Sequence, residues 1–473
     1  MGYLAGMIIL LSLEVSVGDL CVYSINDPIV ALGEGRSMLG LRQDVLGAQV
    51  DAFLGVRYAE PPVGERRFRA AVSVDQSWQG VQRATEFGNA CWQSYSAVPD
   101  NFTGHVWWTT ADRRSEDCLF LNVWTPYPRP TKAPVFVFIH GGSFRVGSSS
   151  TLLYRGDTLA AVENCVVVSM NYRLGSFGFS AFYTDKEPGN LGLMDQTLAL
   201  KWVKDHIKYF GGDPKRVTLI GHSAGAAGVG FHLLSPMSRN LFQRAILQSG
   251  APNTPWAIAH KSEALQAVGK MAKELNCPSW YEAEHVEHEA IVEDTLSCLR
   301  QREPEGFFTS NWRVPIPSSV VVDGKFLLDN PLSLLLNTSL TRNKVPILIG
   351  TVDEEATLSI PFPEFDSVAD ISDVHQSYDT LYKNHINSLF PYTKESIQDA
   401  IDFQYRNWLD PDNGTLLHRS VIELWEDYCM VCPIREFAKY YAMTGNDVYA
   451  YNFDRQPTNS CTLNGWAFCM RMS

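Results

Sequence analysis

One stretch, residues 217–225, constrains the fold of this chain more than any other. Residues 217–220 are mostly apolar and β-branched, which predicts a buried strand. Gly-His-Ser-Ala-Gly follows, and the run to Leu234 has the composition of a helix. A strand, a Gly-x-Ser-x-Gly turn and a helix form the nucleophile elbow, whose strained turn holds a serine hydroxyl clear of the sheet. Ser223 is therefore the candidate nucleophile, with an ordinary turn as the alternative.

The residues around Ser223 fit this interpretation. Side chains at Gly221 and Gly225 would crowd so sharp a turn. The helix that follows directs its positive N-terminal end, and the N–H of Ala224, at the oxygen on which charge would develop.

The size and charge of the chain limit its class. A length of 473 residues allows one large α/β domain or two to three smaller ones. We find no repeat, low-complexity block or linker, so we predict one domain over residues 19–473. The net charge of −13 argues against nucleic acid and anionic membranes as partners. It favours a cationic ligand, or serves solubility alone.

The N-terminus and the cysteines predict an extracellular protein. Residues 1–18 are apolar and end in small residues, as a secretory signal peptide does; a membrane anchor is the alternative. Ten cysteines suit an oxidising compartment. Three glycosylation sequons point the same way: Asn101, Asn337 and Asn413.

The order of the remaining segments predicts an α/β fold. Short alternating runs over residues 19–70 predict an antiparallel entry to the sheet, and residues 196–209 have helical periodicity. Strands that alternate with helices form a mostly parallel sheet with helices on both faces. The expected strands are residues 133–139, 165–170, 217–220, 242–247, 345–350 and 448–453, of which 133–139 and 217–220 are expected to be buried.

Two further runs contain candidate site residues. His-Gly-Gly-Ser at 140–143 follows a strand, and the N–H groups of so bare a loop can join Ala224 in an oxyanion hole; alone, a glycine turn explains it equally well. Asp353, Glu354 and Glu355 follow the strand at 345–350, where open α/β sheets carry site residues. The pattern does not choose among these three acids. Neither a metal site nor a cofactor is predicted.

Three longer runs carry a family resemblance: residues 115–124 (Ser-Glu-Asp-Cys-Leu-Phe-Leu-Asn-Val-Trp), 171–175 (Asn-Tyr-Arg-Leu-Gly) and 188–196 (Pro-Gly-Asn-Leu-Gly-Leu-Met-Asp-Gln). With the elbow, they make the chain similar to the cholinesterases, within the type-B carboxylesterase family of the α/β-hydrolase fold, from residue 27 to about 458. The resemblance implies an acyl-enzyme reaction on a small ester, with a choline ester as the cationic case.

The resemblance also assigns roles to residues. It implies Ser223 as the acyl-forming nucleophile and Glu355 as the triad acid, because Gly350-x-x-x-x-Glu355 has the family spacing, although Val352 replaces the usual Asn. It implies that the oxyanion donors are the amides of Gly142, Ser143 and Ala224. It also implies two disulfides, Cys91–Cys118 and Cys277–Cys298.

The implied substrate residues are mostly indoles. Trp108 matches the indole that stacks on choline, with a packing role beside Trp107 as the alternative. Trp256 resembles the wall of the acyl pocket, and Trp408 matches an indole deep in the gorge. Val314 and Ile316 are expected to face the acyl group and leave room for acyl groups larger than acetyl.

Some positions depart from the family. His222 stands where the family usually has Glu, which removes a carboxylate that would favour a cation. Ser96 replaces an acidic residue at the gorge mouth, and Leu358 and Ser359 replace gorge aromatics. These changes favour a general carboxylesterase as the alternative to a cholinesterase.

The last residues depart furthest. The family's catalytic His follows the strand that corresponds to 448–453, but no His occurs after His418 here. Read in a frame shifted by two bases, permitted codons for the tail encode the family motif, so we interpret this end as frame-shifted or mis-spliced. Such a chain is expected to be impaired, while a full-length form would be active and is a candidate homo-oligomer. A non-catalytic adhesion protein is the remaining alternative.

Overall fold

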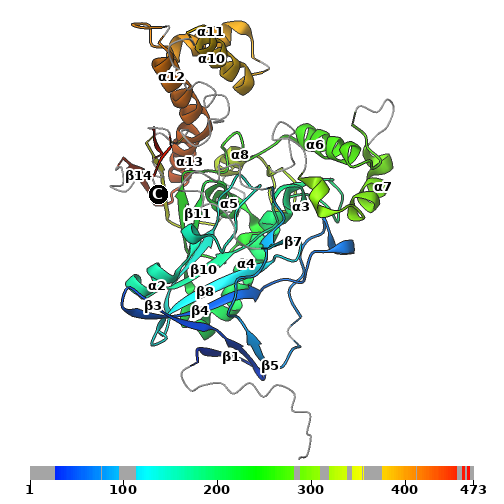
Figure 1. Ribbon diagram of the computed structural model, residues 1–473, viewed down its shortest axis with the longest axis vertical. Coiled ribbons are helices and arrows are strands. Elements are labelled where there is room, and N and C mark those ends of the chain that lie inside the picture. The colour runs from blue at the N-terminus through cyan, green and yellow to red at the C-terminus, as the bar shows by residue number, and fades with distance from the viewer. Residues whose placement is uncertain are drawn as a thin grey trace, which may run out of the picture.

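The computed structural model describes residues 27–75, 77–94, 113–281, 288–308, 319–337, 343–353, 355, 375–391, 393–411, 413–454, 461–463 and 466–468. These residues form a central sheet of nine strands in the order β14-β13-β12-β11-β9-β10-β8-β4-β3 (Figure 1). The strands are β3 (Leu41–Val45), β4 (Ala48–Arg57), β8 (Phe120–Tyr127), β9 (Ala133–Ile139), β10 (Val166–Met170), β11 (Gly212–His222), β12 (Arg244–Gln248), β13 (Ile347–Val352) and β14 (Val448–Phe453).

The sheet is mixed in the way that the sequence predicts. The strands from β14 to β10 pair in parallel. The edge formed by β8, β4 and β3 is antiparallel, which confirms the antiparallel entry. All residues of β10 are buried, as in a parallel strand covered on both faces. The predicted α/β-hydrolase fold is therefore confirmed.

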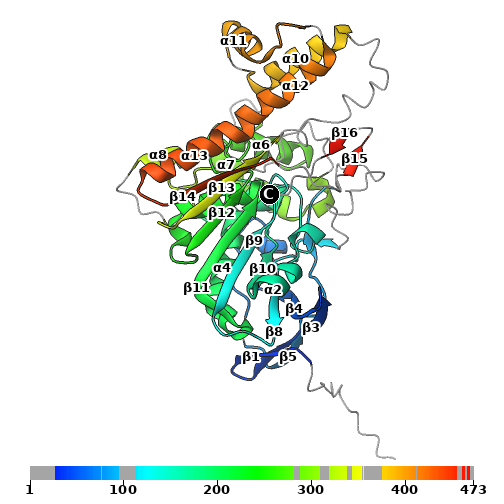
Figure 2. The same ribbon diagram turned by 90° about the vertical axis from the view of Figure 1, so that its left-hand side faces the viewer.

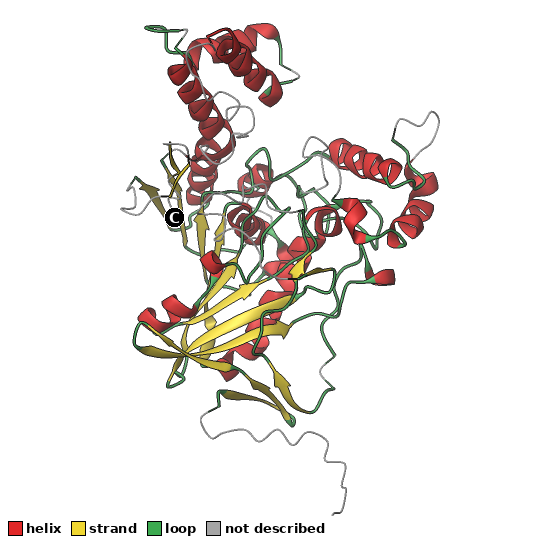
Figure 3. Ribbon diagram, viewed as in Figure 1, coloured by secondary structure: helices red, strands yellow, loops and turns green. Residues whose placement is uncertain are grey.

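Helices surround the sheet (Figure 3). The described helices are α2 (Asp157–Glu163), α3 (Gly175–Phe179), α4 (Leu191–His206), α5 (Ala224–Leu234), α6 (Lys261–Glu274), α7 (His288–Arg300), α8 (Pro331–Leu336), α10 (His375–Leu389), α11 (Glu395–Tyr405), α12 (Gly414–Glu426) and α13 (Cys432–Met443). Short strands lie outside the main sheet: β1 (Ile29–Gly33), β2 (Arg36–Leu39), β5 (Gly80–Arg83), β6 (Ala90–Cys91), β7 (Arg114–Ser115), β15 (Cys461–Leu463) and β16 (Trp466–Phe468).

Alternate residues of one strand show that both faces of the sheet are covered. Val50 and Ala52 of β4 pack in one core with Ala160 of α2. Phe53 and Val56 of the same strand belong to the larger core, which also contains residues of α4 and α5. Since neighbouring strand residues point to opposite faces, α2 covers one face while α4 and α5 cover the other.

An arm of helices projects from this body. Figure 2 shows α12 and α13 as one long rod that leads from the sheet to α10 and α11. A π-helical segment, Asp427–Val431, joins α12 to α13 without a break. The arm has a small core of its own, formed by Tyr382, Ile386, Leu417, Val421 and Leu424.

No helix in the described part of the chain is both long enough and apolar enough to cross a membrane. The predicted signal peptide, residues 1–18, lies outside the described residues.

Candidate active site

The elbow has the predicted geometry. β11 ends at His222, α5 begins at Ala224, and Ser223 between them has φ 54° and ψ −121°. A positive φ is strained for a residue with a side chain, so the neighbours must hold it in place. The Ser223 amide donates to the Gln248 carbonyl at 2.8 Å, and the Ala227 amide donates to the Ser223 carbonyl at 3.0 Å. The serine is thereby fixed on both sides of its turn.

Glycines make this turn possible, as the sequence predicts. An ideal Cβ at Gly221 would lie 2.2 Å from the Gly225 carbonyl oxygen. At Gly225 it would lie 2.1 Å from the Ile139 oxygen, and at Gly250 it would lie 2.3 Å from the Ser223 oxygen. All three contacts are with backbone, which cannot move aside as a side chain can.

The substitution Gly225→Ala is therefore expected to lower the free energy of unfolding by about 3 kcal/mol or more, at the upper end of overpacking costs. Urea denaturation measures this change. Gly228→Ala on the same helix is the control, because its Cβ would meet only side-chain ends, those of Gln196 at 3.2 Å and Leu193 at 3.8 Å. A Gly225→Ala variant as stable as Gly228→Ala would contradict the described turn.

The glycine loop after β9 passes directly beside the nucleophile. An ideal Cβ at Gly141 would lie 3.1 Å from the Ser223 Cβ. The loop has positive φ at Gly142 (114°), Ser143 (54°) and Phe144 (57°), so it turns sharply there. The turn therefore places backbone, rather than a side chain, beside the nucleophile.

Hydrogen bonds hold the loop and leave three amides available. The Tyr172 hydroxyl donates to the His140 carbonyl at 2.8 Å, and the Gly175 amide donates to the Phe144 carbonyl at 2.7 Å. Within the described residues, no protein group accepts from the amides of Gly142, Ser143 and Ala224. These are the donors that the resemblance implies; the Gly141 amide instead donates to the Tyr154 hydroxyl at 3.3 Å.

Among the acids after β13, Glu355 has the environment of a site residue. Its Oε1 accepts from the Val352 amide at 2.9 Å, and its carboxylate also accepts from the Ser249 hydroxyl. Burial raises the pKa of Glu355 above its usual value, and these two hydrogen bonds oppose the rise. Asp353 is exposed and accepts from Asn452, at 3.0 Å, while Glu354 lies outside the described residues.

His222 contributes a neutral imidazole beside the elbow. Its Nδ1 lies 3.4 Å from the Tyr154 hydroxyl. Burial lowers the pKa of His222 to about 4, so the ring is uncharged near pH 7. Where the family usually has a carboxylate, this chain therefore offers no charge.

Trp256 lies against the glycine loop. Its ring centroid is 6.5 Å from that of Phe144, the last residue of the loop. Its indole Nε1 donates to the Cys429 carbonyl at 3.0 Å, which fixes the ring between the loop and the π-helical segment. The predicted position of Trp256 in a wall of the acyl pocket is compatible with these contacts.

Of the remaining predicted substrate residues, Trp408 lies among the described residues. The prediction that Trp408 lies deep in a gorge is corrected: its side chain is 54% exposed on the turn after α11 and packs on Phe403, with ring centroids 5.8 Å apart. Its indole Nε1 also donates to the Phe403 carbonyl, at 3.0 Å, and α11 lies at the end of the arm (Figure 1). The other candidates, Trp108, Val314 and Ile316, lie outside the described residues.

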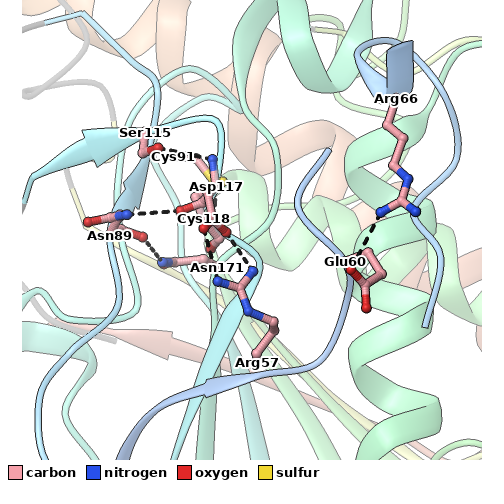
Figure 4. Close-up of polar contacts among 9 residues, drawn as sticks. All are labelled: Arg57, Glu60, Arg66, Asn89, Cys91, Ser115, Asp117, Cys118 and Asn171. Atoms are coloured by element: carbon pink, nitrogen blue, oxygen red, sulfur yellow. Dashed lines mark hydrogen bonds and ion pairs between the residues drawn. A yellow bond between two sulfur atoms is a disulfide. The ribbon is translucent and has the colours of Figure 1, made fainter. Parts of the chain in front are cut away.

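Two of the family-like runs meet in one polar cluster (Figure 4). The Arg57 guanidinium donates to both carboxylate oxygens of Asp117, at 2.6 and 2.9 Å, and the Asp117 amide donates to the Ser115 hydroxyl at 3.1 Å. Asn89 donates to the Asp117 carbonyl at 3.1 Å and accepts, through its own carbonyl, from Asn171 at 2.9 Å. Asn89 thus joins the runs at 115–124 and 171–175.

Both predicted disulfides are confirmed. Cys91–Cys118 lies within the cluster of Figure 4, and Cys277–Cys298 joins the ends of α6 and α7. Of the sequons, Asn337 is exposed, Asn413 is half-buried and Asn101 lies outside the described residues; their glycosylation stays a prediction.

Comparison with known proteins agrees with this geometry. The model of the carboxylesterase family matches residues 26–468. The chain is 38% identical over 433 residues to an acetylcholinesterase of Bungarus fasciatus, covering 89% of this chain and 69% of that protein. It is also 38% identical over 442 residues to a cholinesterase of Mus musculus, covering 91% of this chain and 70% of that protein. The chain therefore belongs to the carboxylesterase family and is a cholinesterase-like carboxylic ester hydrolase.

Proposed function

We propose that the chain is a secreted serine ester hydrolase of cholinesterase type that works through an acyl-enzyme on Ser223. The observation that carries this proposal is the strained backbone of Ser223 with the Gly141 backbone packed against it. An ideal Cβ at Gly141 would lie 3.1 Å from the Ser223 Cβ. A serine in that position has amide donors on one side and a helix N-terminus on the other.

In the proposed reaction the Ser223 Oγ attacks the ester carbonyl carbon while its proton passes to an imidazole base. The carbonyl oxygen becomes an oxyanion, which accepts from the amides of Gly142, Ser143 and Ala224; the loss of one such donor costs on the order of a hundredfold in rate. The alcohol leaves with the proton, and water then releases the acyl group by the same route. Glu355 orients the base.

The expected activity depends on whether a histidine of this chain can act as that base. The ring of His140 contacts the Gly141 carbonyl, and the ring of His206 contacts the Trp202 carbonyl. The two ring nitrogens of His232 contact Ser238 and Gln196. Burial lowers the pKa of all three, which suits structural histidines. We propose that neither these imidazoles nor that of His222, whose Nδ1 lies 3.4 Å from the Tyr154 hydroxyl, serve Ser223, so that this polypeptide turns esters over slowly.

Added imidazole should therefore raise ester hydrolysis by on the order of tenfold or more, since a positioned general base contributes a hundredfold or more. The measurement is the initial rate of p-nitrophenyl butyrate hydrolysis against imidazole concentration. The Ser223→Ala variant is the control for hydrolysis by imidazole alone. If the unchanged chain exceeds this control by the same rate with and without imidazole, that result contradicts the claim that the chain lacks a base.

The alcohol part of the substrate is proposed to be choline or a related group. A Trp108 indole over a cation would contribute about 0.5–2 kcal/mol, which is about 2- to 30-fold in kcat/KM. We expect kcat/KM for butyrylcholine to exceed that for its neutral isostere, 3,3-dimethylbutyl butyrate, by this factor. The substitution Trp108→Leu should bring the ratio near one.

The neutral His222 favours a second candidate, a general carboxylesterase without choline preference. A ratio near one in the unchanged chain would select this second candidate. A chain that hydrolyses neither ester, and whose Ser223 reacts with no fluorophosphonate, would instead be a binding protein.

A further inference from the structure

The last residue of α12 reaches the turn that carries the candidate triad acid. The Glu426 Oε1 accepts from the Glu355 amide at 2.5 Å, across 71 residues of sequence. A carboxylate acceptor makes a stronger hydrogen bond than a neutral group does. The contact therefore joins the base of the helical arm to the end of β13.

This hydrogen bond fixes the Glu355 backbone, while other groups fix its side chain. The carboxylate of Glu355 accepts from the Val352 amide, three residues earlier, and from the Ser249 hydroxyl. Its amide donates to Glu426. Because a rotation of the Glu355 backbone would move its carboxylate away from both donors, the direction of the acid depends on what holds the amide.

The residues that follow Glu426 are themselves anchored. Directly after Glu426, the π-helical segment Asp427–Val431 begins, and its Cys429 carbonyl accepts from the Trp256 indole at 3.0 Å. The Pro433 carbonyl, one turn on, accepts from the Asn253 side chain at 2.9 Å. A π-helical turn holds an extra residue and redirects the side chains on either side of it, and such turns are frequent at functional sites.

We propose that Glu426 is a positioning residue, which sets the direction of the Glu355 carboxylate by accepting a hydrogen bond from the Glu355 amide. The role of Glu355 as triad acid rests on the proposed function, whereas the amide contact does not. Glu426 touches neither the nucleophile nor the ester in this proposal. It links the helical arm to the site, so that the arm influences the reaction without contributing to the pocket.

Three variants of the full chain test the proposal. Glu426→Ala removes the acceptor, Glu426→Gln retains an amide oxygen as acceptor, and Glu423→Gln is the matched control one turn earlier, where an exposed carboxylate pairs with Arg419. Two readouts are measured: hydrogen exchange of the Glu355 amide, and the rate at which a fluorophosphonate labels Ser223 in the presence of added imidazole, which serves as the base that Glu355 orients.

In Glu426→Ala we expect the Glu355 amide to exchange about tenfold faster or more, and Ser223 to be labelled about tenfold more slowly, since a hydrogen bond to a charged group is lost. Glu426→Gln should keep both rates within about threefold of the unchanged chain, because its oxygen still accepts. Glu423→Gln should change neither rate.

Normal exchange and labelling in Glu426→Ala would overturn the proposal. So would a Glu426→Gln variant as impaired as Glu426→Ala, because general loss of structure would then explain both. An unchanged chain that fails to label contradicts the proposed function instead, and the exchange of the Glu355 amide still decides whether Glu426 positions it.

Discussion

Replacing Ser223 with alanine is expected to abolish covalent labelling by fluorophosphonates and to reduce imidazole-assisted ester hydrolysis to the rate that imidazole gives without the protein. The reason is that the hydroxyl on the elbow is the proposed nucleophile, and no neighbouring group can take its place on that turn. In subtilisin, loss of the nucleophile alone costs on the order of a millionfold in turnover. Intact mass and initial rates measure the two effects.

A serine at the other end of α5 provides the control. Ser235 is buried and its hydroxyl caps the following 3₁₀ turn by accepting from the Met237 amide, at 3.2 Å. Ser235→Ala should therefore label as the unchanged chain does, with a small loss of stability. Labelling that survives in Ser223→Ala would show that another residue is the nucleophile.

Breaking the buried pair Arg173–Asp195 is expected to have the largest effect on stability. The Asp195 carboxylate accepts from Arg173 Nε and Nη2, both at 2.7 Å, and from the Arg173 amide at 3.2 Å. The two side chains are 3% and 0% exposed. Asp195→Asn would leave the guanidinium buried without a counter-charge, at a cost of about 3–5 kcal/mol.

The same pair supports the glycine loop through its neighbours. Tyr172, next to Arg173, donates to the His140 carbonyl at 2.8 Å. Equilibrium urea unfolding measures the loss in Asp195→Asn, and the exposed pair Arg419–Glu423 provides the control, where Glu423→Gln should cost less than about 1 kcal/mol. Equal, small losses in both variants would contradict the described burial of Asp195.

The sequence predicts those parts of the site that depend on local chemistry. The elbow, the glycine loop and the strand at 448–453 are all found where the pattern places them, because each depends on residues close together in the chain. The predicted helix at 196–209 is α4 followed by a 3₁₀ turn, and it begins five residues earlier, at Leu191.

The sequence does not predict contacts between distant segments. The hydrogen bonds of Glu355 with Ser249 and Glu426 join three elements, and no spacing along the chain indicates them. Trp408 shows a second limit, since the motif match predicts a buried indole whereas the residue is 54% exposed. Burial depends on how the arm packs, which a local match does not contain.

The most direct test of the account is a crystal structure of the chain after reaction with a fluorophosphonate. We predict a bond between phosphorus and the Ser223 Oγ, with the phosphoryl oxygen within about 3.1 Å of the amide nitrogens of Gly142, Ser143 and Ala224. An adduct on any other residue, or a phosphoryl oxygen directed away from these amides, would contradict the account.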